Sequence, residues 1–125
     1  MSVILNFTQH KATPDQIEDH VWDLNDANRA ELIKLLTFNE IPSNKEIKDR
    51  AIELTKLALA HSHFGTEVMI GGAPYLMSTL EYTLAEAGMK PVYSFTQRQS
   101  IETQNTDGTV TKTNVFKHIG FITMG

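Results

Sequence analysis

Short apolar runs alternate along the chain with longer segments that have the spacing of amphipathic helices. The runs at 3–8, 67–70 and 92–95 predict buried strands, and 21–24 predicts a short strand or an extended link. Apolar residues recur every three or four positions over 26–37, 44–63 and 74–87, which predicts helices with one buried face each. Thr13 and Pro14 are typical of a helix start and predict a further short helix that ends near His20.

The last part of the chain has a different pattern. Residues 98–104 and 109–122 are rich in Thr, Val, Ile and Phe, and the Asp107-Gly108 pair between them is a strong turn signal. The segment 98–122 therefore predicts an antiparallel hairpin, either at the sheet edge or projecting from the body. The order strand, helix, strand over 67–95 requires parallel pairing with a right-handed crossover.

Together these elements predict a single α/β domain over residues 1–125. We expect a three-layer, Rossmann-like fold with a mostly parallel sheet, helices on both faces and a C-terminal antiparallel β-hairpin. A chain of 125 residues suits one compact domain of this kind.

The composition narrows the class of protein. The chain has no apolar stretch long enough to cross a membrane, and its start lacks the basic segment of a signal peptide. Because cysteine is absent, disulfides, thiol nucleophiles and cysteine-based zinc sites are excluded. These features favour a cytoplasmic protein that does not act at a membrane.

The net charge of −4 argues against binding to duplex DNA through its phosphate backbone. The charge is uneven, because residues 1–87 hold seven Lys or Arg against thirteen Asp or Glu, whereas residues 88–125 hold four against two. The basic excess therefore lies with the late strands. Acidic, solvated helices would produce the same asymmetry without any partner.

Two similar strings close apolar runs, Asn6-Phe7-Thr8-Gln9-His10 and Ser94-Phe95-Thr96-Gln97-Arg98. The chance of a shared tripeptide in a chain of this length is roughly even, so only their equivalent positions carry weight. In a parallel sheet both strings would reach the same rim, where open α/β sheets bind ligands. The candidate ligand-binding side chains are Thr8, Gln9, Thr96, Gln97 and Ser100.

His10 and Arg98 are the candidate catalytic groups at that rim. A histidine can move a proton or carry charge near neutral pH, and an arginine can hold a phosphate or carboxylate with two hydrogen bonds. The alternatives are a solvated histidine in a polar loop and a surface arginine at the root of a hairpin.

A third strand end is Gly71-Gly72-Ala73-Pro74, which opens a predicted helix. Glycines allow close approach of a ligand to the backbone, and the helix N-terminus offers free N–H groups to an anion. We include Gly71, Gly72 and Ala73 among the candidate ligand-binding residues. A tight turn that needs small residues explains the same letters without a ligand.

The remaining histidines predict no further site. His61 and His63 are one residue apart, which does not place both on one helical face, so no metal is expected. His118 falls in the last strand and is expected to be structural or exposed. Residue spacing shows no Ser-His-Asp arrangement and no cofactor motif.

The chain resembles the small Rossmann-like proteins of CRISPR systems, namely CARF sensor domains and stand-alone ring nucleases. The resemblance rests on Ile4–His10 as a first strand with a polar end, on Gly71–Pro74 opening a helix, and on the compact architecture over nearly the whole chain. It implies a role in antiviral defence and a homodimer that holds a cyclic oligoadenylate across its two-fold axis. It also implies cleavage without a metal, by attack of a ribose 2′-hydroxyl on the adjacent phosphate.

We therefore carry two main hypotheses. The first is a domain that binds a nucleotide or another phosphate-bearing ligand at the rim and, if it is an enzyme, cleaves a phosphodiester without a metal or cofactor. The second is a non-catalytic, dimeric interaction or accessory protein that uses the C-terminal hairpin. A small hydrolase or transferase for a nucleoside phosphate or sugar phosphate is a third reading.

Overall fold

A computed structural model of the chain describes residues 2–124 and contains a five-stranded sheet with the strand order β2-β1-β3-β4-β5. Neighbouring strands are parallel except for β4 and β5, which are antiparallel. The strands are β1 (Ile4–Phe7), β2 (Val21–Trp22), β3 (Glu67–Ile70), β4 (Lys90–Gln104) and β5 (Val110–Thr123). The predicted α/β class, with a mostly parallel sheet and a C-terminal antiparallel hairpin, is confirmed.

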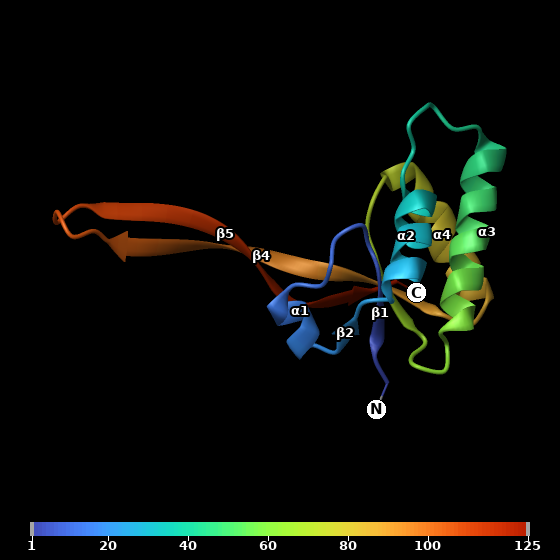
Figure 1. Ribbon diagram of the computed structural model, residues 1–125, viewed down its shortest axis with the longest axis horizontal. Helices are drawn as coiled ribbons and strands as arrows, with labels where there is room; N and C mark the ends of the chain where they lie inside the picture. The colour runs from blue at the N-terminus through green and yellow to red at the C-terminus, as the bar shows by residue number, and fades with distance from the viewer. Residues whose placement is uncertain (1, 125) are drawn as a thin grey trace.

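The two faces of the sheet are covered unequally. Three helices gather against one face, and the short helix α1 stands apart from them near the root of the hairpin (Figure 1). The helices are α1 (Pro14–Glu18), α2 (Asp26–Leu36), α3 (Asn44–Ala60) and α4 (Pro74–Glu86). Leu5, Phe7 and Val68 belong to the large core under α2, α3 and α4, whereas Met69 and Val92 pack on the opposite side in a much smaller cluster.

The predicted helix starts are confirmed by their caps. Thr13 forms a capping box with Gln16 at the start of α1, and the side chains of Asn25 and Ser43 accept from the backbone of α2 and α3. These short-range bonds satisfy N–H groups that would otherwise lack partners, which is why the local sequence predicts them well.

Gly65 has a role that the sequence alone did not show. Its position after α3 suggested a helix stop, but a Cβ atom there would lie 1.9 Å from the carbonyl oxygen of Val3. The turn before β3 therefore passes directly against the backbone that leads into β1, and only glycine fits that approach.

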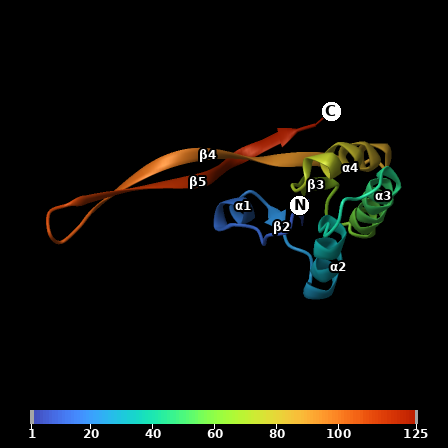
Figure 2. The ribbon, with the colours of Figure 1, turned by 90° about the horizontal axis from the view of Figure 1, so that it is seen from above.

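The expected strand end at residues 94–98 is wrong. β4 does not stop after Phe95 but continues to Gln104, paired with β5 throughout, with a register shift between Phe95 and Thr96. Beyond that shift the two strands leave the body as a long ribbon, seen from two directions in Figures 1 and 2. We call this ribbon, residues 96–117, the arm.

The arm is almost entirely exposed to solvent. Only Gln99 and Val115 within it are partly covered, and Phe116 is 72% exposed. The hairpin lies at the edge of the sheet, where β5 pairs with β4, and its distal part projects from the body, so both arrangements expected for it are present. Among residues 2–124, each helix is too short or too polar to span a bilayer.

Candidate functional site

A cleft of about 620 Å³ opens at the carboxyl ends of β1 and β3, where β4 passes at the same level. This is the rim at which ligands bind in open α/β sheets. The cleft is lined by Thr8, Gln9, His10, Lys11, Thr13, Gln16, Met69, Ile70, Gly71, Gly72, Tyr93 and Ser94.

The loop that forms one wall of the cleft is held by a buried asparagine. The side chain of Asn6 is fully buried in β1, and its amide nitrogen donates to Asp23 Oδ1 at 2.7 Å and to the carbonyl of His10 at 2.8 Å. Its oxygen accepts from the backbone N–H of Thr8 at 3.0 Å and from the Thr8 hydroxyl at 2.7 Å. Asp23 also accepts from the backbone N–H of Ala12 at 3.0 Å. These bonds determine the path of residues 8–12.

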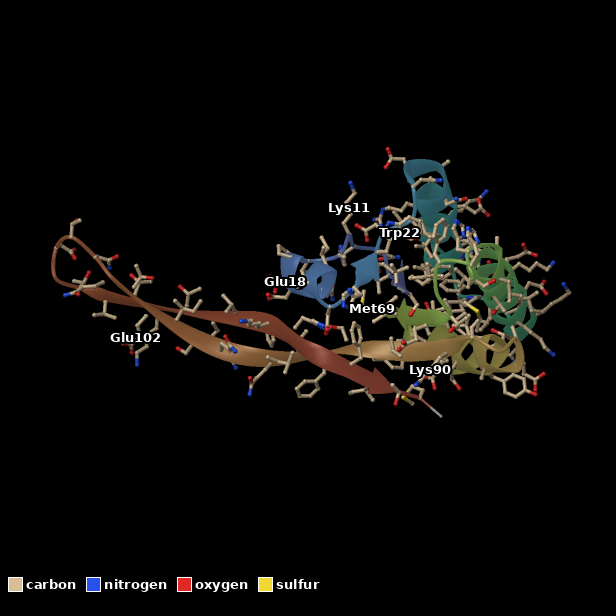
Figure 3. All side chains as sticks on the ribbon, turned by 90° about the horizontal axis from the view of Figure 1, so that it is seen from below. Lys11, Glu18, Trp22, Met69, Lys90 and Glu102 are labelled. Carbon is tan, nitrogen blue, oxygen red and sulfur yellow. The ribbon has the colours of Figure 1, made fainter. Side chains whose placement is uncertain are left out.

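Some polar side chains of this loop are held by hydrogen bonds within the fold, and others are exposed to solvent. The Gln9 amide donates to Thr37 Oγ1 at 3.2 Å, which ties it to the end of α2, and Arg29 donates to the Gln9 carbonyl at 3.2 Å. His10 and Lys11 are exposed, and Figure 3 shows Lys11 extending away from the fold. His10 and Lys11 are therefore the cationic or proton-carrying groups that the loop presents.

The opposite wall is the turn from β3 into α4. Gly72 has a φ of +150°, which favours glycine, and Thr8 lies 3.4 Å from the position that a Cβ atom of Gly71 would take. No side chain caps α4, whose first residue, Pro74, has no N–H group. The first turn of α4 therefore receives no hydrogen bond from a capping side chain.

The charge of the cleft is opposite in sign to that of the chain. The net charge of the chain is −4, yet none of the described residues that line the cleft is Asp or Glu, and Lys11 is among them. Such a lining favours an anion over a metal ion. No group of three or more His, Asp or Glu side chains within residues 2–124 is arranged to hold a metal.

The structure brings together only part of the predicted site. Thr8, Gln9, His10, Gly71 and Gly72 line one cleft, as expected from their strand-end positions. Ala73 serves as the N-terminal cap residue of α4 and is outside the lining.

The other predicted residues lie on the arm because β4 continues past Phe95 to Gln104. Thr96, Gln97, Arg98 and Ser100 are all exposed there, and Arg98 is paired with Phe116 of β5. Within one chain Arg98 does not share the cleft with His10. A ligand-binding role for these four arm residues stays a prediction.

Residue spacing did not reveal one group beside the cleft. Ser94 Oγ lies 2.6 Å from His118 Nδ1, and His118 Nε2 lies 3.0 Å from Asp19 Oδ2. Gln16 of α1, the helix whose C-cap residue is Asp19, donates to Ser94 Oγ at 3.4 Å. His118 is buried, in contrast to the exposed alternative considered from sequence. Ser94 lines the cleft, so this chain of side chains reaches it.

Tyr93 is a neighbour of Ser94 that points to the other side of β4. Its hydroxyl donates to Glu81 Oε2 in α4 at 2.6 Å. Burial, the hydrogen bond to Glu81 and the charge of that carboxylate all raise the pKa of the Tyr93 phenol. Tyr93 therefore stays protonated far above neutral pH and fixes one edge of the cleft.

Comparison with known proteins gives a family but no characterised relative. Neither the curated proteins nor the solved structures contain a significant match to the chain. The model of one protein family matches residues 2–122, which is nearly the whole chain. The chain belongs to the family described as the Uncharacterized protein MJ1673 family.

Proposed function

We propose that the protein binds a nucleotide or another phosphate-bearing ligand in the cleft at the carboxyl ends of β1 and β3. The observation that carries this proposal is the lining itself, whose described residues include Lys11, His10 and a Gly-Gly turn and no carboxylate. Backbone amides before a helix and a nearby lysine are groups that proteins commonly use to hold phosphate oxygens.

Cyclic oligoadenylate is the ligand we propose first, because the chain resembles CARF domains and ring nucleases of CRISPR-based antiviral defence. In that setting the protein acts in the cytoplasm as a homodimer. His10 is the group that would move a proton if the bound phosphodiester is cleaved by attack of its own ribose 2′-hydroxyl. Arg98 takes part only if the arm of a second copy brings it to the cleft.

Calorimetric titration with cyclic tetra-adenylate and linear adenylates, with adenosine as the ligand without phosphate, tests the binding proposal. We expect the adenylates to bind and adenosine not to bind. Lys11→Ala should raise Kd about tenfold, which corresponds to about 1.4 kcal/mol. Lys56→Ala, on the exposed face of α3, is the matched control and should leave Kd unchanged.

Arg98→Ala separates two arrangements of the same site. Weaker binding in this variant would indicate that an arm from a second copy reaches the cleft, because one chain does not bring Arg98 there. Unchanged affinity would remove Arg98 from the site. Failure of every phosphate-bearing ligand to bind the intact chain would overturn the proposed function.

The arm supports a second candidate function, that of a dimeric interaction protein. An isolated two-stranded ribbon is marginally stable in water, so an arm of this length is expected to be covered by a partner. We take that partner to be a second copy, since residues 88–125 carry a basic excess and residues 1–87 an acidic one. Light scattering on the intact chain should give the mass of a dimer, and a monomer at high micromolar concentration would argue against this function.

A further inference from the structure

We propose that Ser94, His118 and Asp19 form a catalytic relay and that Ser94 is a nucleophile facing the cleft. The inference rests on the proposed function for its substrate class, a phosphodiester. It goes beyond that function by naming a covalent step and the groups that perform it.

The hydrogen-bond chain has a definite direction. An ionised carboxylate only accepts hydrogen bonds. Nε2 of His118 therefore carries the proton and donates to Asp19 Oδ2 at 3.0 Å. That leaves Nδ1 of a neutral imidazole as an acceptor, and Ser94 Oγ at 2.6 Å must donate to it. This is the order of roles in a Ser-His-Asp triad, with the two ring nitrogens exchanged.

A bulge in the hairpin turns His118 toward Ser94. The register passes from Phe95 opposite Gly120 to Thr96 opposite His118, so Ile119 is the extra residue. In a regular strand His118 and Phe121 would lie on opposite faces, because side chains alternate. With the bulge they share one face, and their rings lie 4.8 Å apart. Bulges that redirect a side chain are common beside active sites.

Burial keeps the imidazole in this arrangement. The His118 side chain is only 4% exposed, whereas that of Asp19 is 47% exposed and remains in contact with water. Gln16 donates to Ser94 Oγ at 3.4 Å, and its own oxygen is held by the backbone N–H of Thr13 at 3.0 Å. Ser94 thus has a fixed donor, a fixed acceptor and an open side toward the cleft.

The reaction needs only water besides the phosphodiester. Ser94 Oγ forms a bond to phosphorus, its proton passes to His118 Nδ1, and the bond from phosphorus to one ester oxygen breaks. That oxygen leaves as an alcohol once it receives the proton. Water then attacks the phosphoserine diester, loses a proton to His118 and releases Ser94 and a phosphomonoester. Lys11 and the backbone amides of the Gly-Gly turn are the groups that would stabilise the negative charge on phosphorus. Asp19 is a positioning residue, because it acts through His118.

Labelling with a fluorophosphonate, followed by peptide mass spectrometry, tests whether Ser94 is a nucleophile. We expect one adduct, on Ser94, and none in Ser94→Ala. Ser78→Ala, at an exposed serine of α4, is the matched control and should be labelled like the original chain.

The same labelling rate tests the other members of the relay. His118→Asn should slow labelling about a hundredfold or more. Asp19→Asn should slow it less and Asp19→Glu should restore it, while Glu18→Gln should have no effect.

A thiol at the same position gives an independent measurement. Because the chain has no cysteine, Ser94→Cys and Ser78→Cys each introduce a single thiol. We expect Ser94→Cys to react with iodoacetamide at neutral pH about tenfold faster than Ser78→Cys although it is less exposed, because a neighbouring imidazole promotes the thiolate. Adding His118→Asn should remove the difference, and far-ultraviolet circular dichroism would check that each variant is folded.

The outcomes separate this proposal from the proposed function. If adenylates bind to the original chain and to Ser94→Ala but Ser94 is neither labelled by the phosphonate nor reactive as a thiol, the relay is a structural clamp and the proposal is overturned. If Ser94 is labelled but no phosphate-bearing ligand binds, the nucleophile stands and the proposed ligand class is wrong. Labelling that adenylates slow would support both.

Discussion

The buried Asn6 shows how much one polar side chain can determine at the edge of a small sheet. Its side chain forms hydrogen bonds with Asp23, with the carbonyl of His10, and with the N–H and hydroxyl groups of Thr8. These bonds connect β1 to the loop that lines the cleft. An unpaired buried polar group costs about 1–3 kcal/mol, which makes Asn6 a structural requirement of the site.

Asn6→Ala should lower the free energy of unfolding by about 2–3 kcal/mol, because it removes an amide that binds a carboxylate and leaves the Thr8 N–H without its acceptor. Urea denaturation measures this change. Asn39→Ala, at an exposed position between α2 and α3, is the control and should stay within about 0.5 kcal/mol. Equal stability of the two variants would contradict the role assigned to Asn6.

Single residues were predicted from sequence only where their partners are near in the chain. Thr8, Gln9 and His10 follow directly after β1, and their place at the rim follows from the strand pattern alone. The contact of Asp19 with His118 joins residues 99 positions apart, and it depends on a bulge that no local pattern indicates. Residue spacing therefore could not reveal the Ser94 relay.

At the scale of elements, the phenol of Tyr93 forms a hydrogen bond that joins β4 to α4. Tyr93 donates to Glu81 across the face of the sheet, and the pKa of Tyr93 is raised by burial and by this carboxylate. The raised pKa in the folded state means that folding favours the protonated phenol. The contribution of Tyr93 to the free energy of unfolding is complete below a pH of about 10, which is the pKa of an unfolded tyrosine. This contribution is lost as the pH rises above that value.

The original chain should therefore lose stability between about pH 9 and pH 11 by more than Tyr93→Phe does. Urea denaturation of both proteins at several pH values measures the difference. The phenylalanine variant is expected to be less stable near neutral pH, because Glu81 loses its donor, and the gap should narrow as the pH rises. Tyr75→Phe, at an exposed position of α4, is the control for removal of a tyrosine. If the free energy of unfolding changes with pH in the same way for the original chain and for Tyr93→Phe, the pH-dependent role assigned to Tyr93 is contradicted.

Helices were more predictable than the length of the late strands. The caps at Thr13, Asn25 and Ser43 are local signals, and α1, α2 and α3 begin where these signals place them. Residues 96–100 carry threonine, glutamine and arginine, which are typical of a loop after a buried strand. They are in β4 because β5 pairs with them, and that pairing depends on the whole hairpin.

At the scale of the molecule, a compact body carries a ribbon with little to stabilise it. The arm extends far from the three helices, and Figure 3 shows Glu102 well separated from Lys11, Met69 and Lys90 of the body. Glu102 pairs across the ribbon with Lys112 at 3.5 Å, an exposed contact that contributes little. The arm therefore adds little to the stability of the body, and we propose that its length serves an interaction with another molecule.

A shortened chain tests this interpretation. Gln99 and Val115 are paired across the ribbon, so replacing residues 100–114 with Asn-Gly should close a two-residue hairpin turn without changing the register. We expect the variant to keep the unfolding temperature of the body at a concentration where both proteins are monomers. Light scattering should show that it no longer dimerises at concentrations where the intact chain does.

The same variant separates the two candidate functions of the protein. The cleft is lined entirely by residues outside 100–114, so adenylate binding that survives while the dimer is lost would assign assembly to the arm and the ligand to the cleft. Loss of both would mean that the ligand is held between two copies, as Arg98 on the arm would require. A variant that dimerises like the intact chain would show that the arm is not the dimer contact, because the body alone would then supply it.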